Sequence, residues 1–541
     1  MMGAAENMTD NLQKNESLLT MPELVAAVKG SMLGVGAELL ASSNAAGTSN
    51  AAASSVVSSK SIVFTSVATD SRNVVSFSLF VPLVGEKQNG HIYIPQALEK
   101  GASVVFINNS EYSEKSALYD EMASKNPGVA FITVENTLHA LQDAAEAYVA
   151  KFPNLTKVSI TGSCGKTTTK ELMAAVCVRH FGAEKSVYTK GNFNSETGLP
   201  LSVFNIRKEH KVGVFEMGMN RVNEIGEISK VLKSKYGIIT NIGTAHIGIL
   251  GSRQNIATEK RKSFDYIPAD GACFVPAADD FADFCTQNVK GKIVKFGDDE
   301  KSLAELGISD VKDCGILGTK FILDGIQVNL HLGGKYNFIN ALGVIACTKE
   351  LGIPAEEIKE GIESVNGLAG RLEIKRLVLK NKSLLLIQDC YNANLDSMSA
   401  SIEFGAKLVQ GGAGTDDAGV CEKGACKIIF VLGDMKELGD SSEKSHREIG
   451  TKLNSVAENA EVFVFFVGPE MRFAFEEFAC KNHAEYFENN DDNSFRKIAD
   501  KIEDIASNDD VILLKGSHSM SLEKLTDLFL KDGGTLKDES L

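Results

Sequence analysis

The sequence lacks long apolar runs, a recognisable secretory leader and an excess of basic residues. None of its uninterrupted apolar runs reaches the ~18 residues that a membrane-spanning helix needs, so we expect no membrane insertion. The first residues, MMGAAENMTDNLQKNESLL, have neither a basic start nor an apolar core, and they therefore do not predict a secretory signal. The expected compartment is the cytoplasm.

The charge balance is acidic, with a formal net charge of -15 at pH 7. Proteins that bind nucleic acid as their main partner usually carry a basic surface, so this balance argues against such a partner. An anionic ligand has to be held locally by Lys, Arg and helix N-termini. We expect a monomer without a nucleic-acid partner.

The ten cysteines are scattered without paired spacing. Five of them lie in apolar or motif surroundings: Cys164, Cys177, Cys273, Cys347 and Cys390. This pattern predicts reduced, buried thiols and no disulfide framework. Cys421 and Cys426 lie in a Gly-rich stretch, but two cysteines without further Cys or His partners make a poor metal site.

A chain of 541 residues is too long for one hydrophobic core, and ~150 residues per domain predicts about three domains. Hydrophobic residues make up 43% and charged residues 23%, which is typical of a globular protein. We expect a disordered tail at 1–17 and flexible insertions at 42–60 and 411–426, because these stretches are polar or Gly-rich and lack an apolar period.

The predicted fold class is α/β with three domains. Residues 1–154 contain SLFVPLVG and ASVVFINN, which read as strands, and HIYIPQALEKGA and LHALQDAAEAYVAKF, which read as helices. Residues 155–366 alternate apolar strands with helices, which predicts a mostly parallel sheet. Residues 367–541 repeat this theme in SLLLIQDC, KIIFVLGD, VFVFFVG and DVILLKGS, which predicts a Rossmann-like sheet.

The stretch SITGSCGKTTTKEL places Gly162, Ser163, Cys164, Gly165, Lys166 and Thr167 between a strand and the start of a helix. Glycines allow the backbone amides to face phosphate oxygens, the lysine neutralises the outer phosphates, and the threonine hydroxyl can hold Mg²⁺. The general P-loop has four residues between its first glycine and the Gly-Lys pair, whereas this stretch has two. The alternative interpretation is a plain turn that joins strand to helix.

Glu216, in KVGVFEMG, and His246, in NIGTAHIG, fall at the carboxyl ends of predicted strands, and we expect them to reach one edge of the sheet. Glu216 is a candidate Mg²⁺ ligand, and the alternative is a solvated carboxylate. A lone histidine is more often simply hydrogen-bonded. Lys260 lies in the helical stretch NIATEKRKSF, where a solvated basic face is the alternative interpretation.

Seven motifs occur in an order that resembles the Mur ligases, ATP-dependent enzymes that form amide bonds in peptidoglycan precursor synthesis. They are TGSCGKTTTKE, GNFNSETGLPLS, EMGMNR, NIGTAHIGILGS, GGKYNFINAL, GLAGRLE and DCYNANLDSMSAS. Within that family, LGDMKELGDSSEKSHREIG, LLKGSHSM and LFVPLVGEKQNGHIYIPQALEKGA resemble the members that add D-alanyl-D-alanine to UDP-MurNAc-tripeptide. The resemblance extends over roughly residues 62 to 530.

The resemblance implies that ATP and Mg²⁺ are used and that the central domain binds the nucleotide. The implied nucleotide-binding residues are Gly162, Ser163, Cys164, Gly165, Lys166, Thr167, Thr168, Asn337, Asn340 and Arg371. The implied metal ligands are Thr167, Glu216, His246 and Lys260, the last as a carbamate. Lys166, Glu216, His246, Lys260, Arg371 and Asp389 are the implied catalytic residues.

The resemblance also implies where the substrates bind. Asp70, Ser71 and Arg72 of the N-terminal domain match the element that meets the UDP group, and Asn192, Asn194 and Glu196 are implied to face the peptide. The dipeptide end is implied to be shaped by Tyr391, Asn392, Asn394, Ser397, Lys515 and Ser517. Two positions depart from the family pattern: Leu395 replaces a common proline, and His518 replaces a common arginine.

Two other functions remain open from the sequence. The first alternative is a ligase with a different acceptor, such as an amino-acid-adding enzyme or a folylpolyglutamate synthase. The second is a P-loop binding protein or a regulatory ATPase. The amino-acid-adding enzymes usually carry Asp-Asn-Pro-Arg, which is absent here. A mere binding protein leaves the motifs around Arg371 and Asp389 without a purpose. The third residue of the tripeptide is also open.

Overall fold

The computed structural model describes residues 17–34, 62–410 and 426–538. The tail predicted at 1–17 and the insertions predicted at 42–60 and 411–426 therefore lie outside the described residues, except for Ser17 and Cys426. Ser17 Oγ accepts a hydrogen bond of 3.0 Å from Phe64 N, so this residue belongs to the folded N-terminal part. The described cysteines carry free thiols as predicted, except for Cys426, which is disulfide-bonded.

The contacts divide the chain into two compact units. The first comprises Met1–Leu155, Thr189–Gly213 and Glu227–Lys233, and the second comprises Thr156–Tyr188, Val214–Gly226 and Ser234–Leu541. The break after Leu155 lies next to the predicted boundary between residues 154 and 155, whereas the boundary near 366 stays a prediction. No helix in the described part of the chain combines the length and the apolar character that crossing a bilayer requires.

The first unit is built on a five-stranded sheet of order β1-β5-β4-β3-β2, in which only β1 is antiparallel to its neighbour. Its strands are β1 (Ser31–Met32), β2 (Ser66–Ala68), β3 (Ser78–Phe80), β4 (Ala102–Asn108) and β5 (Ala130–Val134). Its helices are α1 (Met21–Val28), α3 (Ile94–Glu99), α4 (Asn109–Lys125), α5 (Thr137–Ala150) and α7 (Gly198–Val203). All residues of β4 and β5 are buried, because helices cover both faces of a parallel sheet.

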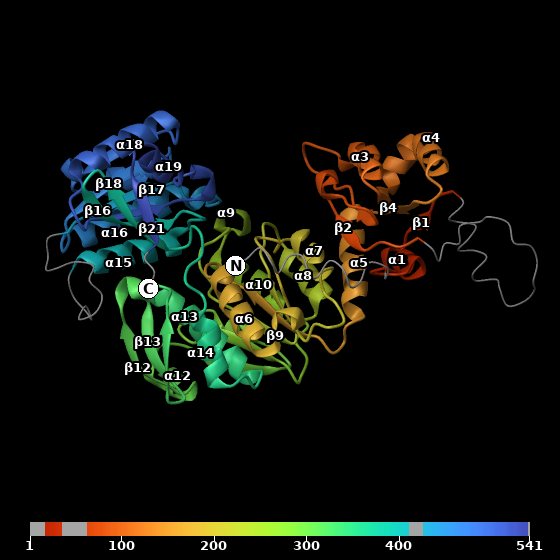
Figure 1. Cartoon of the computed structure of the whole chain (residues 1–541), viewed down its shortest axis with the longest axis horizontal. Helices are drawn as coiled ribbons and strands as arrows, with labels where there is room; N and C mark the ends of the chain where they lie inside the picture. The colour runs from red at the N-terminus through yellow and green to blue at the C-terminus, as the bar shows by residue number, and fades with distance from the viewer. Residues whose placement is uncertain (1–16, 35–61, 411–425, 539–541) are drawn as a thin grey trace, which may run out of the picture. The chain divides into compact units, whose positions relative to one another are not determined.

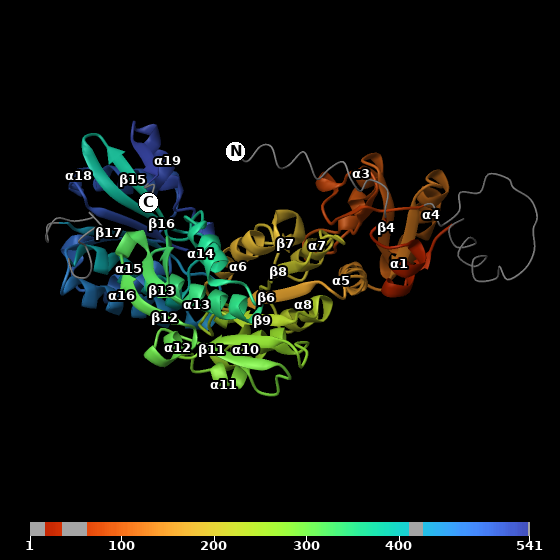
Figure 2. The ribbon, with the colours of Figure 1, turned by 60° about the horizontal axis from the view of Figure 1, so that its bottom comes forward.

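The second unit contains a six-stranded sheet of order β11-β10-β9-β6-β8-β7. Its strands are β6 (Thr156–Thr161), β7 (Ser186–Tyr188), β8 (Val212–Glu216), β9 (Tyr236–Ile239), β10 (Ala272–Pro276) and β11 (Lys292–Phe296). The helices in this part of the chain are α6 (Lys166–Phe181), α8 (Glu224–Leu232), α9 (Ile247–Leu250), α10 (Arg253–Arg261), α11 (Ala282–Cys285), α12 (Glu300–Glu305), α13 (Lys335–Glu350) and α14 (Ala355–Glu363). The neighbouring strands β6, β8 and β9, labelled in Figure 2, lie at its centre. Their carboxyl ends share one edge, where ligands bind in sheets of this kind.

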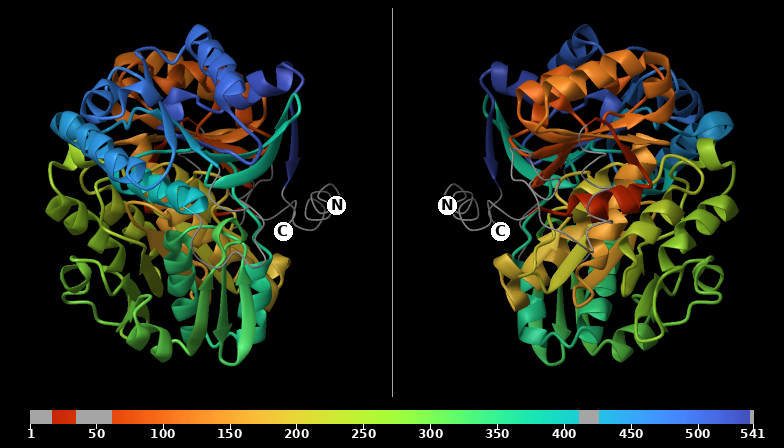
Figure 3. Two further views of the ribbon diagram at one scale, coloured as in Figure 1. Left: turned by 90° about the vertical axis from the view of Figure 1, so that its left-hand side faces the viewer. Right: turned by 90° about the vertical axis from the view of Figure 1, so that its right-hand side faces the viewer.

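A three-stranded antiparallel sheet, which the sequence analysis did not predict, follows in the chain. It consists of β12 (Ile308–Asp313), β13 (Thr319–Leu323) and β14 (Ile326–Leu330), seen in green in the left panel of Figure 3. The turn between β13 and β14 is Asp324-Gly325, and both residues have positive φ, 49° and 85°. This dipeptide next to the alternating burial of β13 is the hairpin signal that the sequence analysis missed.

The remaining sheet has seven strands in the order β19-β18-β17-β20-β16-β15-β21 and is parallel from β19 to β16. Its strands are β15 (Glu373–Leu379), β16 (Lys382–Asp389), β17 (Ile428–Gly433), β18 (Val462–Val467), β19 (Ala484–Phe487), β20 (Val511–Lys515) and β21 (Thr535–Asp538). Its helices are α15 (Leu395–Val409), α16 (Ser442–Ala457), α17 (Met471–Glu477), α18 (Asp492–Ile505) and α19 (Lys524–Lys531). In Figure 1, α18 and α19 cover one face of this sheet, and α15 and α16 cover the other.

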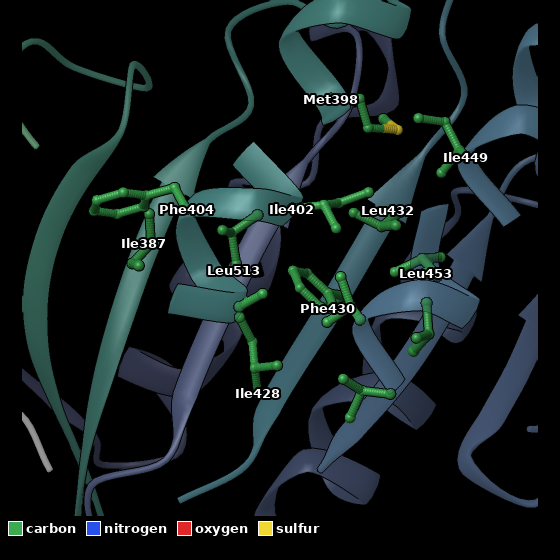
Figure 4. Close-up of a cluster of buried hydrophobic side chains, with 14 of the residues drawn as sticks. Ile387, Met398, Ile402, Phe404, Ile428, Phe430, Leu432, Ile449, Leu453 and Leu513 are labelled. Carbon is green, nitrogen blue, oxygen red and sulfur yellow. The ribbon is translucent and has the colours of Figure 1, made fainter. Parts of the chain in front are cut away.

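The core under α15 holds this helix on the sheet. Ile402 of α15 packs with Phe430 and Leu513 of two adjacent strands, and all three are fully buried (Figure 4). Burying one such side chain stabilises the fold by roughly 1.5–3 kcal/mol. The three-domain α/β class predicted from the sequence is confirmed.

Candidate active site

The Gly-rich turn connects β6 to α6 and can be built only with glycine at two positions. Gly162 has φ 152°, and an added Cβ would lie 1.8 Å from Thr240 Oγ1. Gly165 has φ 79°, and its added Cβ would lie 2.5 Å from Asn340 Oδ1. Any larger residue would therefore have to displace neighbouring side chains at the start of α6.

Two amides of this turn are already used within the protein. Ser163 N donates to Asn241 O, and Cys164 N donates to Asn241 Oδ1, each at 3.0 Å. We expected successive amides of the turn to face phosphate. For the amides of Ser163 and Cys164 this expectation is wrong, because both bond to Asn241. The remaining donors belong to the first turn of α6, which begins at Lys166 and whose first amides have no acceptor within the helix. An anion therefore fits at the helix start, where the helix dipole also favours it.

Two lysines converge on one carbonyl of the turn. Lys166 Nζ donates to Gly162 O at 2.8 Å, and Lys260 Nζ donates to the same oxygen at 2.9 Å. Burial lowers the pKa of Lys166 and lowers that of Lys260 well below its ordinary value, and the charge of Lys166 adds to the second effect. Lys260 is only 1% exposed, so the solvated basic face considered for it is wrong.

The first turn of α6 also meets the end of β8. Thr167 Oγ1 donates to Glu216 Oε2 at 2.9 Å, and Glu216 is buried. The solvated carboxylate considered for Glu216 is therefore wrong as well. The next residue of the predicted nucleotide site, Thr168, is buried in the same turn.

His246 precedes α9 and has a positive φ of 64°. Its Nδ1 lies 2.7 Å from Glu437 Oε2, a contact between the ring and the carboxylate that is not a hydrogen bond in this structure. The contact with His246 and the charge of Lys166 lower the pKa of Glu437. The structure thus gives His246 an acidic partner that the sequence analysis did not identify.

The side chains at the start of α6 fit a magnesium ion that keeps most of its water. In the described residues, no group of three or more His, Cys, Asp or Glu side chains is arranged to hold a metal ion. Mg²⁺ in phosphoryl-transfer sites usually binds only one or two protein oxygens plus phosphate oxygens and water. The Thr167 hydroxyl and the Glu216 carboxylate, 2.9 Å apart, offer such a pair.

The two asparagines of α13 are both buried, but in different surroundings. Asn340 faces Gly165, which places its side chain directly against the Gly-rich turn. Asn337 Nδ2 donates to Gly333 O at 2.7 Å, one turn earlier. Asn340 therefore has the more direct access to a nucleotide held at the turn.

The predicted residues that follow β16 and β20 form one polar cluster. Lys515 Nζ lies 2.8 Å from Asp389 Oδ2 and donates to Asn392 O, also at 2.8 Å. Ser401 Oγ and Leu372 N both donate to the Asp389 carboxylate. The cluster orients the loop that follows β16.

Arg371, Tyr391 and His518 stack on one another beside this cluster. The Arg371 guanidinium lies over the Tyr391 ring, 4.0 Å from its centre. The His518 ring stacks on Tyr391 with ring centres 5.9 Å apart and an interplanar angle of 25°. His518, one of the two departures from the family pattern, is therefore in contact with a predicted site residue.

The end of the loop after β16 contacts the Gly-rich turn, and the first turn of α15 contacts the loop after β9. Asn394 caps α15 by accepting from Ser397 N, and its side chain contacts Cys164 Sγ at 3.1 Å. Asp396 Oδ2 accepts from Thr244 N and Thr244 Oγ1 at 2.7 and 2.8 Å. These bonds bring the C-terminal part of the second unit to the Gly-rich turn.

Some predicted substrate residues already make bonds within the fold. Ser517 Oγ accepts from Lys436 N at 2.9 Å. In the first unit, Arg72 pairs with Asp70, while Ser71 Oγ donates to Gln96 Oε1 at 2.6 Å.

The other predicted residues of the first unit are Asn192, Asn194 and Glu196. Asn194 N donates to Asn192 O at 2.8 Å, and Gln142 Nε2 donates to Glu196 O at 3.2 Å. These residues, like Asp70, Ser71 and Arg72, belong to the first unit, whereas the Gly-rich turn belongs to the second.

Three residues that contact the site were missed by the sequence analysis: Asn241, Asp396 and Glu437. Asn241 comes two residues after the end of β9 and begins the quoted motif NIGTAHIGILGS, so its position just beyond a strand end was the available signal. Asp396 and Glu437 lie in quoted motifs too, but nothing local indicates that they reach Thr244 and His246.

Comparisons with known proteins cover most of the chain. Residues 63–149 match the Mur ligase family, catalytic domain; residues 160–348 match the Mur ligase middle domain; residues 370–518 match the Mur ligase, glutamate ligase domain. These three matches follow one another in the order of the predicted domains.

Individual relatives are similar over nearly their whole length. The UDP-N-acetylmuramoyl-tripeptide–D-alanyl-D-alanine ligase of Treponema pallidum is 36% identical, over 87% of this chain and 94% of that protein. The ligase of the same name from Bacillus subtilis is 31% identical, over 86% and 92%. A crystal structure of MurF from Acinetobacter baumannii is 26% identical, with a TM-score of 0.73 over 95% of this chain and 98% of that one. This chain therefore belongs to the Mur ligase family.

Proposed function

We propose that this protein is an ATP-dependent ligase that joins D-alanyl-D-alanine to UDP-N-acetylmuramoyl-tripeptide and releases ADP and phosphate. The product is the UDP-MurNAc-pentapeptide used in peptidoglycan synthesis. The observation that carries the proposal is the likeness to ligases of this name at 36% and 31% identity over more than nine tenths of their length. The polar groups gathered around the Gly-rich turn supply the chemistry that such a reaction needs.

A carboxylate does not condense with an amine in water, because oxide is too poor a leaving group. In the proposed reaction a carboxylate oxygen of the tripeptide attacks the γ-phosphorus of ATP, and ADP leaves. The start of α6 holds the phosphates, and Lys166 neutralises charge that develops on the transferred group. Its place on the Gly162 carbonyl keeps its ammonium group beside the turn.

The amine of D-alanyl-D-alanine then attacks the carbonyl carbon of the acyl phosphate. A tetrahedral oxyanion forms, the amine loses a proton, and inorganic phosphate leaves as the amide bond is completed. Preorganised positive groups next to such an oxyanion are worth several kcal/mol in a site shielded from water. Lys166 is the proposed group, with Arg371 supplied from the C-terminal part of the chain.

Magnesium is proposed to be held by Thr167 and Glu216, with His246 and a carbamate of Lys260 as further ligands. When bound, the ion supplies charge compensation for the phosphate oxygens. The neutral amine is the form of lysine that reacts with carbon dioxide, and the burial that lowers the pKa of Lys260 favours this form. Asn337 and Asn340 are proposed to lie near the adenine and ribose.

The substrate sites are proposed from the family resemblance. Asp70, Ser71 and Arg72 would meet the UDP group, and Asn192, Asn194 and Glu196 would face the peptide. The residues proposed to shape the dipeptide end are Tyr391, Asn392, Asn394, Ser397, Lys515 and Ser517, while Asp389 is proposed to face the nucleotide together with Arg371. The proposed domains are 1–154 for the UDP precursor, 155–366 for ATP and 367–541 for ligation. We propose a cytoplasmic monomer.

The test is a coupled assay of ADP release with ATP, Mg²⁺ and UDP-MurNAc-tripeptide. Turnover that requires D-alanyl-D-alanine supports the proposal, whereas turnover with a single amino acid indicates a different acceptor. ADP release that is independent of any acceptor indicates an ATPase. Supplying tripeptides that end in diaminopimelate, lysine or ornithine identifies the third residue.

The control for this assay is Lys166→Ala, which should lower ADP release at least about 100-fold, since one preorganised stabilising group is commonly worth 10²–10³ in rate. Lys185→Ala changes an exposed lysine and should leave turnover unchanged. Substantial turnover by Lys166→Ala would mean that the Gly-rich turn does not hold the reacting phosphate.

A further inference from the structure

The contact between His246 and Glu437 joins two distant parts of the second unit. His246 lies in the loop after β9, at the edge that carries the Gly-rich turn. Glu437 lies in the loop after β17, in the C-terminal sheet. Glu437 Oε2 and His246 Nδ1 are 2.7 Å apart, and the His246 side chain is mostly buried while that of Glu437 is half exposed.

The backbone holds Glu437 in this place independently of its carboxylate. Gly248 N donates to Glu437 O at 3.0 Å, so the main chain of the loop docks on the start of α9. The two backbone segments approach so closely that a Cβ at Gly248 would lie 2.4 Å from Gly439 N. The loop after β17 is therefore fitted to the segment that carries His246.

Glu437 itself has a left-handed backbone, with φ 64°. This conformation is unfavourable for a residue with a side chain and easy for glycine. A strained residue of this kind calls for a functional explanation. The loop tolerates glutamate where glycine would fit the backbone better, and the side chain that it gains is the carboxylate next to His246.

The base of the loop is anchored by buried polar groups. Asp434 is fully buried and accepts from Met471 N at 2.9 Å and from Lys436 Nζ at 2.8 Å. Met435 N donates to His446 Nε2 at 3.1 Å. The loop therefore presents Glu437 from a rigid support, as a group that orients another side chain requires.

We propose that Glu437 is a positioning residue that orients the His246 imidazole at the phosphate site. The inference rests on the proposed function, which gives His246 its role. Carboxylates that orient a histidine ligand are a common means of setting its ring position and tautomer. The C-terminal part of the chain thereby completes the site, because the carboxylate reaches His246 only when the loop after β17 docks on α9.

The test compares Glu437→Gly with the wild-type enzyme. Glycine removes the carboxylate and suits the left-handed backbone, so the melting temperature should stay equal or rise. We expect kcat to fall about 10- to 100-fold, as for other residues that orient a ligand, with the KM for ATP changed little. The affinity for Mn²⁺, measured by EPR in the presence of ADP, should fall about 10-fold. Glu443→Gln, an exposed glutamate in the following helix, is the control and should change none of these.

A double variant separates positioning from an independent effect. If Glu437 acts through His246, adding Glu437→Gly to His246→Ala should cause no further loss of kcat. Unchanged kcat and Mn²⁺ affinity in Glu437→Gly, or losses that multiply in the double variant, would overturn the inference. Should the wild-type enzyme show no turnover with D-alanyl-D-alanine, the proposed function fails, and the Mn²⁺ comparison still decides whether Glu437 acts on this site.

Discussion

Thr167 Oγ1 donates a hydrogen bond of 2.9 Å to Glu216 Oε2, which joins the first turn of α6 to the carboxyl end of β8. The hydroxyl and the carboxylate are thus held in one place before any ligand binds. Preorganisation of this kind lets binding proceed without reordering the side chains.

Glu216→Gln tests whether the charge at this place matters. Glutamine keeps the shape and an acceptor oxygen, so the bond from Thr167 and the melting temperature should be preserved. We expect ADP release to fall at least about 100-fold, because an ionised oxygen ligand for Mg²⁺ is lost. The measurement is ADP release over a range of Mg²⁺ concentrations, and a normal rate at moderate Mg²⁺ would contradict the metal-ligand role.

Gly165→Ala and Gly352→Ala form a matched pair for the Gly-rich turn. Their φ values are 79° and 75°, but an added Cβ meets Asn340 at Gly165 and nothing within 4 Å at Gly352. Both variants should lose about 1 kcal/mol of unfolding free energy through backbone strain. Only Gly165→Ala should also bind nucleotide more weakly, and the affinity for ADP measured by calorimetry checks this. Equal effects in both variants would mean that Asn340 and the turn do not depend on each other.

Lys260 should form a carbamate in the presence of bicarbonate. Its amine is buried, and its pKa is lowered well below the ordinary value by burial and by the charge of Lys166, which favours the reactive neutral form. Incubation with ¹³C-bicarbonate should produce a carbamate signal in the ¹³C NMR spectrum. The signal should be missing in Lys260→Gln, and its persistence in that variant would assign it to another lysine.

Removing one partner of the Asp389–Lys515 pair should destabilise the C-terminal part. The two side chains are 14% and 3% exposed and lie 2.8 Å apart, so a lone partner would remain buried and charged. Breaking such a pair costs about 3–5 kcal/mol, and we expect Lys515→Met to lower the unfolding free energy by about 3 kcal/mol. Urea unfolding followed by circular dichroism provides the measurement, since the chain has no tryptophan. In the double variant with Asp389→Asn the losses should be less than additive; full additivity would argue against coupling.

Acid should weaken the fold through His446. This residue is fully buried, its Nε2 accepts from Met435 N at 3.1 Å, and burial lowers its pKa from the ordinary 6.5. Below pH 6.5 the unfolded chain takes up a proton that the folded chain does not, so stability falls as the pH decreases. The slope is at most about 1.4 kcal/mol per pH unit for one such group.

The measurement compares urea unfolding at pH 7.5 and pH 5.5 for the wild type and His446→Gln. The loss of stability at pH 5.5 should be smaller in the variant, because glutamine does not titrate. His483→Gln changes an exposed histidine in the same part of the chain and serves as the reference substitution. An equal loss in the wild type and His446→Gln would show that other groups cause the acid sensitivity.

Much of the site was predictable because its elements carry local signals. Gly162 and Gly165 bracket a turn whose backbone only glycine adopts without conflict, and the helix that begins at Lys166 follows at once. Glu216 is the last residue of the buried strand β8, and His246 lies in the loop that follows the buried strand β9. In a parallel sheet those ends share an edge, so these positions were available from the pattern of apolar runs.

The partners of these residues were not predictable in the same way. Lys260 reaches Gly162 across 98 positions of sequence, and Asn394 reaches Cys164 across 230. From the residues alone the solvated lysine face was the plainer interpretation, since nothing in NIATEKRKSF indicates that Lys260 faces inward. The bonds that Ser163 N and Cys164 N donate to Asn241 likewise depend on β9 lying next to β6.

The sequence by itself determined the α/β class, the place of the Gly-rich turn and the family, because dihedral preferences, apolar periodicity and motif order are properties of neighbouring residues. Only the tertiary structure decided which side chains meet: two lysines on one carbonyl, Thr167 on Glu216, and Glu437 on His246. Those contacts depend on the order of strands in the sheets and on how loops from separate sheets dock. Burial, charge and packing across the whole fold set that order, and no short stretch of sequence encodes it.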